Sequence, residues 1–150
     1  MRIVLQRVKN ASVEVDCKIV GSINQGLLIY LGIESEDQQK DIDWLVKKVT
    51  QLRTFSDDNA KMNHNIQDID GEFLVVSQFT LYASTKKGNR PSFTGAAQPE
   101  LAEKLYKDFI GTLETKLNKT IQTGRFGANM QVVSINDGPL TFILDSKQKS

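Results

Sequence analysis

Short stretches in which polar and apolar residues alternate open the chain, and this is the pattern of half-buried strands. They cover residues 4–8, 11–15 and 19–23, and a polar break at residues 16–18 precedes the last of them. Residues 26–33 form instead a continuous apolar run bounded by glycines, which is too short for a comfortable helix. The pattern predicts a meander of short strands that leads into a central strand buried on both faces.

Two longer segments place their apolar residues at helical spacing. Ser35 and Gln38 have the spacing of a capping box, so a first helix is expected over about residues 36–53. Pro99 suits the first turn of a second helix, where its missing N–H costs nothing. The apolar positions are Ile42, Leu45, Val46, Val49 and Leu52 in the first segment and Ala102, Leu105, Tyr106, Phe109, Leu113 and Leu117 in the second. Each helix is therefore expected to bury one face.

Further strands are expected after the first helix. The candidates are residues 73–76, 121–123, 130–135 and 140–144. Asp137-Gly138 is typical of a turn and separates the last two. Because no repeat, low-complexity tract or linker divides the chain, we expect an α+β (mixed α/β) fold in a single domain of residues 1–150.

Chain length and cysteine content narrow the class of protein. With 150 residues the chain can bury a core without staples, and its single cysteine, Cys17, has no partner for an intrachain disulfide. The first residues do not form a signal peptide, and no run approaches the roughly 20 apolar residues of a membrane span. We therefore expect a soluble protein of the reducing cytoplasm.

The charge balance excludes a general attraction to polyanions, because 19 basic residues face 18 acidic ones. Any contact with RNA must be local. Basic residues do gather at Lys86, Lys87 and Arg90, and again at Lys147 and Lys149. On charge alone, a solvated loop and a solvated tail are the simpler interpretation of these groups.

Two short segments break the apolar pattern where a buried strand should continue. One is Ser77-Gln78-Phe79-Thr80-Leu81, and the other is Asn136-Asp137-Gly138-Pro139-Leu140-Thr141. Such breaks are where functional sites are expected. If the two segments meet in space, they define a site.

The side chains available for chemistry exclude several mechanisms. A nucleophile activated by an imidazole could use only His64, which stands in a polar stretch typical of a loop. One histidine and one cysteine do not make a zinc site, and no glycine-rich phosphate loop is present. Hydroxyl groups and backbone N–H groups remain, and these can act as oxyanion donors at a strand end. The simpler alternatives are that Ser77 and Thr80 satisfy local backbone groups, and that Gly138-Pro139 is an ordinary trans turn.

The same residues resemble the D-aminoacyl-tRNA deacylases of the D-Tyr-tRNA deacylase type, over essentially the whole chain. The most specific motifs are Ser77-Gln78-Phe79-Thr80 and Asn136-Asp137-Gly138-Pro139. The other matching stretches are Gln6-Arg7-Val8, Ala11-Ser12-Val13, Phe55-Ser56-Asp57, Lys61-Met62-Asn63, Arg90-Pro91-Ser92-Phe93, Thr123-Gly124-Arg125-Phe126 and Met130-Gln131-Val132. So many motifs in the right order make coincidence improbable.

The resemblance implies a fold and an activity. The fold has curved, barrel-like β-sheets and two main helices, and it forms a homodimer with an active site at each end of the interface. The activity is hydrolysis of the ester that joins a D-amino acid, or glycine, to the 3′-terminal adenosine of tRNA. Neither a cofactor nor a metal is implied, and the partners are tRNA and a second copy of the chain, without a membrane.

The resemblance also assigns roles to residues. Gly138 and Pro139, joined by a cis bond, enter the pocket of the partner subunit, where their carbonyls hold the substrate's amino group and exclude an L side chain. Arg7 orients these carbonyls, Asn136 belongs to the same motif, and Met130 lines the pocket. The ester lies at the catalytic segment, Ser77, Gln78, Phe79 and Thr80.

The chemical step has two interpretations. Thr80 matches a residue once assigned as the nucleophile, yet no base stands near it in sequence. We therefore favour a template mechanism, in which the Phe79 N–H stabilises the oxyanion while water attacks with help from the ribose 2′-hydroxyl. Two departures from the family pattern are Asn129, where many relatives carry Asp, and the tail from Ser146, a candidate for tRNA contact. A non-catalytic RNA-binding dimer and a Thr80-dependent hydrolase of another ester remain as alternatives.

Overall fold

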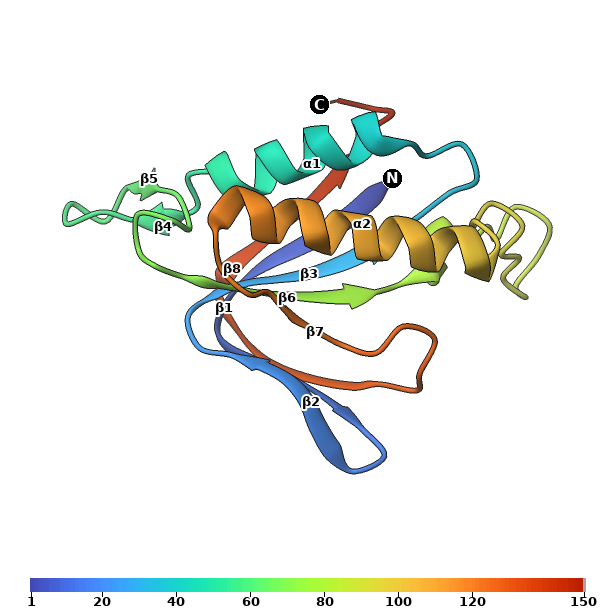
Figure 1. Cartoon of the computed structure of the whole chain (residues 1–150), viewed down its shortest axis with the longest axis horizontal. Helices are drawn as coiled ribbons and strands as arrows, with labels where there is room; N and C mark the ends of the chain where they lie inside the picture. Colours follow the sequence, from blue (N-terminus) through green and yellow to red (C-terminus); the bar gives the residue numbers. More distant parts are fainter. Residues whose placement is uncertain (150) are drawn as a thin grey trace.

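The computed structural model describes residues 1–149, in which a strongly curved, nearly closed sheet carries two helices on one face (Figure 1). The main sheet has six strands in the order β2-β1-β3-β6-β7, and β8 pairs with the other edge of β1. The strands are β1 (Arg2–Val15), β2 (Lys18–Ile23), β3 (Gly26–Gly32), β6 (Glu72–Ser77), β7 (Gln122–Thr123) and β8 (Gln131–Asp145), and a small arm holds β4 (Phe55–Ser56) and β5 (Met62–His64). The helices are α1 (Gln39–Gln51) and α2 (Pro99–Leu117), with a 3-10 turn η1 (Phe79–Tyr82). The mixed α+β, barrel-like fold is confirmed.

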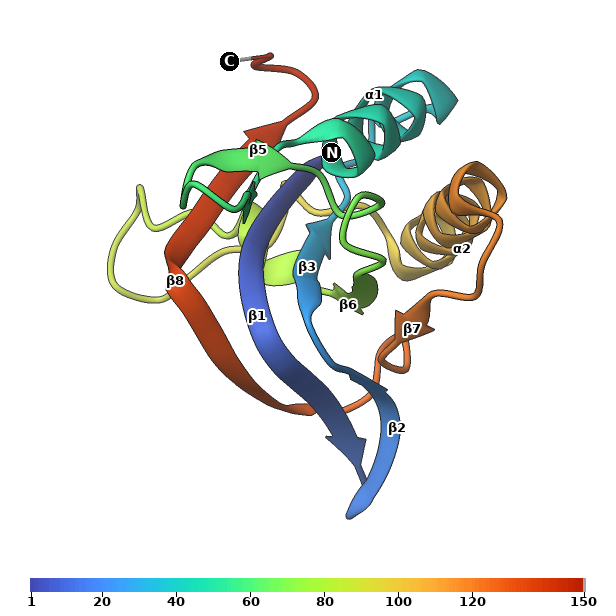
Figure 2. The same ribbon diagram turned by 90° about the vertical axis from the view of Figure 1, so that its left-hand side faces the viewer.

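The long strand β1 organises the sheet. Its first half pairs with β3, its second half pairs with β2, and β8 runs antiparallel along its other edge (Figure 2). The expected strands 4–8 and 11–15 are therefore parts of one 14-residue strand. The chain reverses only after β1, where Asp16 and Cys17 both adopt positive φ in a two-residue turn.

The expected turn at Asp137-Gly138 is wrong. Residues 130–135 and 140–144 belong to one 15-residue strand, β8, which never reverses direction because it pairs with β1 along its whole length. The glycine and proline instead lie where the register with β1 shifts, at Gln6/Val8 and Val8/Asn10. A bulge of this kind bends a strand and re-aims its side chains. The local sequence signal was real, but it marked an irregular strand.

The first helix starts later than the capping pattern suggested. Ser35 is not the cap: the Gln38 N–H bonds the Asp41 carboxylate at 2.8 Å, and α1 begins at Gln39. The preceding residues are held elsewhere, since the Glu34 N–H bonds the Asp37 carboxylate at 2.8 Å. The second helix begins at Pro99, as expected, and ends at Leu117, where Asn118 caps it in the left-handed region. Neither helix is long and apolar enough to span a membrane, and the described residues contain no other candidate.

Two apolar cores lie on opposite faces of the sheet. The larger core packs α1 and α2 on one face, and the smaller fills the inside of the curved sheet. Strand β3 contributes to both, because Leu27 and Ile29 face the helices while Leu28 faces the inner core. The prediction of a central strand buried on both faces is thus confirmed. Because both faces of β3 and β6 are packed, the place where β6 ends is held rigidly.

The two ends of the described chain are packed together. The Met1 amino group is buried and bonds the Asp37 carboxylate and the Ser146 hydroxyl. Lys147 reaches the Asp41 carboxylate at 3.2 Å. The start of the tail therefore lies against the N-terminal segment and α1.

Candidate active site

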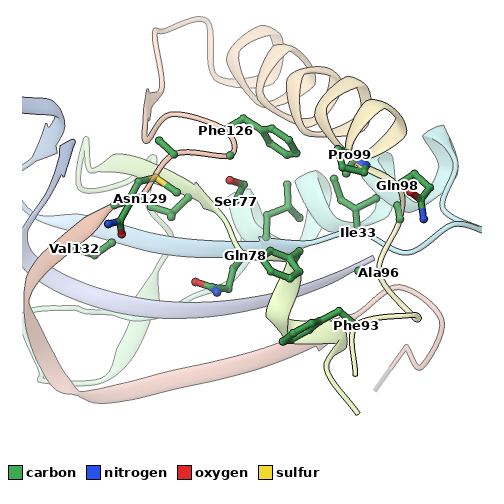
Figure 3. A pocket seen from close by; sticks show the side chains of 18 residues that line it. Ile33, Ser77, Gln78, Phe93, Ala96, Gln98, Pro99, Phe126, Asn129 and Val132 are labelled. Carbon is green, nitrogen blue, oxygen red and sulfur yellow. The ribbon is translucent and has the colours of Figure 1, made fainter. Parts of the chain in front are cut away.

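A cavity of about 550 Å³ lies between the end of β6, the N-terminal end of α2 and the segment that leads into β8 (Figure 3). The lining residues are mainly apolar, with polar groups only from serine, glutamine and asparagine side chains and from the backbone. They are Leu31, Ile33, Val76, Ser77, Gln78, Phe79, Phe93, Ala96, Ala97, Gln98, Pro99, Ala102, Phe126, Gly127, Ala128, Asn129, Met130 and Val132. No titratable side chain lines the cavity, so its chemistry depends on neutral donors and on position.

The polar residues Ser77 and Gln78 lie where β6 ends. Strand β6 runs parallel to β3, and the Gln78 N–H still bonds the Leu31 carbonyl at 2.8 Å before the chain turns into η1. The turn passes close to Gly32, where an added Cβ would lie 3.1 Å from the Gln78 carbonyl oxygen. Glycine at this position therefore allows η1 to fold back against β3. Sequence patterns placed this segment at a strand end, and the structure does the same.

The first N–H groups of η1 are free of backbone partners in the described part of the chain. Those of Phe79 and Thr80 bond no acceptor within residues 1–149, which is usual for the first N–H groups of a helical turn. Phe79 is half-exposed at the cavity and packs edge-on against Phe93, with ring centroids 5.1 Å apart. The turn therefore has free backbone donors next to two aromatic residues of the cavity wall.

The neighbour of the Thr80 hydroxyl is a hydrogen-bond donor and not a base that could activate it. The side-chain amide of Gln78 donates a hydrogen bond to the Thr80 oxygen, and Thr80 itself is exposed beside the cavity, outside its lining. His64 lies in the β4–β5 arm, 3.8 Å from Asp68, and Cys17 lies in the β1–β2 turn. Among residues 1–149 no three histidine, cysteine or acidic side chains gather as a metal site. A base-activated nucleophile thus has no support from the geometry.

Buried contacts fix the floor of the cavity. Tyr106 of α2 donates its hydroxyl proton to the Val75 carbonyl at 2.9 Å, and burial raises the pKa of Tyr106 to about 12, so the donor stays protonated. Phe126 packs on Tyr106 with ring centroids 5.6 Å apart. Gly124 makes room for Met130, since an added Cβ would lie 2.5 Å from its sulfur. Met130, which the sequence analysis expects in a pocket wall, is one of the residues that line this cavity.

The second special segment is held outside the cavity. Arg7, with its side chain only 14% exposed, donates to the Asp137 carbonyl at 2.9 Å and to the Thr54 carbonyl at 2.6 Å. The Asn136 amide donates to the Arg7 carbonyl at 2.9 Å and to the Leu140 carbonyl at 3.2 Å. Gly138 and Pro139, joined by a cis peptide bond, are exposed between these anchors. Within one chain the structure therefore does not bring this segment to Ser77 and Gln78.

The outer face of β8 is unusually apolar for an exposed surface. Ile143 is 69% exposed, Val133 is 63% exposed and Ile135 is 51% exposed. Strand β8 is also an edge strand, because it pairs only with β1 among the described strands. Exposed apolar side chains along a free edge are typical of a surface that contacts another protein.

Sequence patterns did not single out much of the cavity wall. Phe93 and Phe126 appear in the sequence analysis only within matching motifs, Ala102 appears only as an apolar position of the second helix, and Gln98 does not appear. Asn129, noted as a departure from the family pattern, does line the cavity (Figure 3). Phe93 and Phe126 are aromatic residues in segments without a periodic apolar pattern, which is a weak signal that they have a role outside the core.

Comparison with protein families gives one match that covers most of the chain. The model described as D-Tyr-tRNA(Tyr) deacylase matches residues 4–145. A D-aminoacyl-tRNA deacylase of Flavobacterium psychrophilum is 57% identical over 149 residues, which is 99% of each protein. A D-aminoacyl-tRNA deacylase of Cytophaga hutchinsonii is 57% identical over 146 residues, which is 97% of each protein.

Solved structures agree with this similarity. The c-Myc DNA unwinding element binding protein is 40% identical, with a TM-score of 0.90, and the match covers 97% of this chain and 98% of that one. A probable eukaryotic D-amino acid tRNA deacylase is 15% identical, with a TM-score of 0.84, over 95% and 97% of the two chains. The second likeness supports the fold alone.

Proposed function

Because the chain belongs to the D-Tyr-tRNA(Tyr) deacylase family, we propose that it hydrolyses the ester of D-aminoacyl-tRNA and releases free tRNA and the D-amino acid. It is a D-aminoacyl-tRNA deacylase by family, a hydrolase that acts on aminoacyl-tRNA. The observation that carries this function is the near full-length match at 57% identity, with both specific motifs intact. The work of such an enzyme is chiral proofreading in translation quality control, in the cytoplasm where aminoacyl-tRNA is used.

The cavity is the proposed site of the aminoacyl group. Its volume of about 550 Å³ lies within the range of small-molecule sites, and its apolar lining suits amino-acid side chains of different shapes. Ser77, Gln78 and Phe79 line it on the side where the ester would lie, and Thr80 follows them in η1. A site without charged side chains has little means to distinguish one amino-acid side chain from another, which suits a broad substrate range.

The proposed chemistry is a template mechanism. Water adds to the ester carbonyl, and the free N–H of Phe79 stabilises the oxyanion that forms. The tetrahedral intermediate then expels the ribose 3′-oxygen, which takes a proton as the C–O bond breaks. The neighbouring 2′-hydroxyl can relay the proton from the attacking water, so the protein itself needs no base. This agrees with a cavity that contains no titratable side chain.

The proposed chiral filter is Gly138-Pro139 of a second copy of the chain. The two residues are exposed, and Arg7 and Asn136 hold the segment from both sides. The apolar outer face of β8 lies on the same strand and would form part of the contact between the copies. Backbone carbonyls that hold the substrate's amino group leave space for a side chain on one side of the α-carbon only. Glycine has no side chain and would be accepted, so Gly-tRNA is a second proposed substrate.

The test of this function compares matched D-Tyr, L-Tyr and Gly esters on the same tRNA. We expect rapid deacylation of D-Tyr-tRNA and Gly-tRNA, with L-Tyr-tRNA left at the spontaneous rate. The measurement is the first-order loss of the ester with purified protein and no added metal. Equal rates for D-Tyr and L-Tyr would exclude chiral proofreading, and no hydrolysis of any ester would exclude the deacylase.

Replacement of Thr80 with alanine separates the two mechanisms. The hydroxyl accepts a hydrogen bond from Gln78 and touches no base, so its loss is expected to lower kcat by less than about tenfold. Removal of a true nucleophile would cost several orders of magnitude, on the order of 10⁴-fold or more. Single-turnover rates of Thr80→Ala and Thr80→Ser on D-Tyr-tRNA give the answer. A covalent adduct on Thr80 in a quenched wild-type reaction would instead establish the nucleophile.

A further inference from the structure

We propose that the loop formed by residues 84–92, called here the basic loop, binds backbone phosphates of the tRNA strand that leads into the cavity. This inference rests on the proposed function and adds to it the surface that holds the polyanionic part of the substrate. The cavity can hold only the end of a tRNA, because its volume is about 550 Å³. The preceding nucleotides must therefore lie outside, against the residues around its mouth.

The two ends of the basic loop are joined by hydrogen bonds. Its ends are joined by two backbone hydrogen bonds of 2.8 Å, from the Ser84 N–H to the Ser92 carbonyl and from the Ser92 N–H to the Ser84 carbonyl. Gly88, with a φ of 130°, allows the chain to turn at the tip. The hydrogen bonds hold Lys86, Lys87 and Arg90 together on an exposed loop. This lowers the entropy lost when the loop binds a ligand.

The loop is attached directly to the cavity wall. Phe93 follows its last residue, lines the cavity and packs against Phe79 (Figure 3). Arg90 is three residues away from Phe93, so its backbone lies within roughly 10 Å of this wall. The loop projects beside the start of α2 (Figure 1, yellow). A strand that leaves the cavity past Phe93 would meet the basic loop next.

Two of the segments that line the cavity carry only positive charge, whereas Glu34 and Glu100 adjoin the lining residues Ile33 and Pro99. The segments 73–99 and 115–136 supply most of the lining, and neither contains an aspartate or a glutamate, although the whole chain has 18. The three cations of the basic loop make no ion pair within residues 1–149, and Arg125 is an exposed cation beside the opposite wall. A chain with a net charge of +1 thus presents a local positive surface at the mouth of its site. Backbone phosphates carry the charge that fits that surface.

The test compares two variants that each remove three positive charges. The first is K86Q/K87Q/R90Q in the basic loop. The matched control is K40Q/K47Q/K116Q, whose lysines lie on α1 and near the end of α2 and form no ion pair within the described residues. Lys116 is far from the cavity, because 14 residues of helix separate it from Ala102, or about 21 Å. Each protein is assayed on D-Tyr-tRNA and on 3′-(D-tyrosyl)adenosine, which has no phosphate.

Loss of phosphate contacts should change the salt dependence of kcat/KM on D-Tyr-tRNA and leave that on the adenosine ester unchanged. Three contacts to a single strand contribute a slope of about −2 to log kcat/KM against log salt. Between about 50 mM and 200 mM salt, the wild type and the control variant should therefore lose about 20-fold more activity on D-Tyr-tRNA than the basic-loop variant. At low salt the basic-loop variant should be at least about tenfold slower than the control on tRNA, with the adenosine ester hydrolysed equally by all three.

Other outcomes overturn the inference. If both variants keep the wild-type salt slope and rate on D-Tyr-tRNA, the basic loop is only solvated surface. If the basic-loop variant fails equally on the adenosine ester, the loop supports the cavity wall and does not bind phosphate. A wild type that hydrolyses neither substrate instead contradicts the proposed function, so the two failures are distinguishable.

Discussion

Replacement of Arg7 with alanine is expected to lower kcat/KM for D-Tyr-tRNA by at least about 100-fold. The guanidinium holds the Asp137 carbonyl and the Thr54 carbonyl, and it lies 3.7 Å from the Asp137 carboxylate. Alanine leaves both carbonyls without their donor and frees the segment that presents Gly138 and Pro139. If that segment reads the substrate of the partner subunit, a shift of about 1 Å is enough for an effect of this size.

Lysine at position 7 is a more specific probe of the same contacts. It keeps the charge but lacks the planar fork, so it cannot donate to the Asp137 and Thr54 carbonyls in the same geometry. We expect Arg7→Lys to recover little of the activity lost in Arg7→Ala. The matched control is Arg53→Ala. Arg53 also donates to a backbone carbonyl, at 2.9 Å, but its acceptor is Asn63 in the β4–β5 arm. An Arg7→Ala protein with normal folding and wild-type kcat/KM would show that Arg7 does not position the filter.

The helices and the central strand could be predicted from sequence because each has one simple pattern of apolar residues. Helix α2 buries Ala102, Leu105 and Phe109 along one stripe, and Pro99 marks its start. Strand β3 is apolar throughout because it faces a core on both sides. In these elements the local sequence pattern and the tertiary packing favour the same residues. The local pattern is therefore sufficient to predict the element.

The continuity of β8 could not be predicted, because it depends on a distant partner. Asp137, Gly138 and Pro139 favour a turn in any short window. Whether the chain reverses there is decided by β1, which offers one uninterrupted edge with register shifts opposite this segment. The start of α1 was missed for a similar reason. Asp37 is engaged by the Met1 amino group and the Glu34 N–H, contacts that no local pattern reveals.

The candidate site was predictable in part. Ser77 and Gln78 were expected at a strand end, and they border the cavity there. The rest of the wall comes from residues 93–102 and 126–132, which meet β6 only through the tertiary fold. Apolar loop residues such as Phe93 carry no periodicity, so their sequence does not distinguish a cavity wall from a core contact.

Replacement of Ile143 with aspartate is expected to convert a dimer into a monomer and to remove activity at low protein concentration. Ile143 is 69% exposed, so the isolated chain should keep its stability within about 0.5 kcal/mol. In a two-fold interface each substitution counts twice. Two lost isoleucine contacts and two unpaired carboxylates should weaken association by at least about 4 kcal/mol, or roughly 1000-fold in the dissociation constant.

The measurements are molar mass by light scattering and kcat/KM on D-Tyr-tRNA over a range of protein concentrations. The wild type should have twice the mass of the 16.8 kDa chain, and the Ile143→Asp protein should regain activity as its concentration rises. Leu101→Asp is the control for a new surface carboxylate, since Leu101 is 36% exposed on α2, away from β8. A dimeric Ile143→Asp protein would place the interface on another surface. A monomeric Ile143→Asp protein with full activity and full rejection of L-Tyr-tRNA would show that each chain selects the D-amino acid alone. The structure argues against this outcome, because Gly138 does not line the cavity of its own chain.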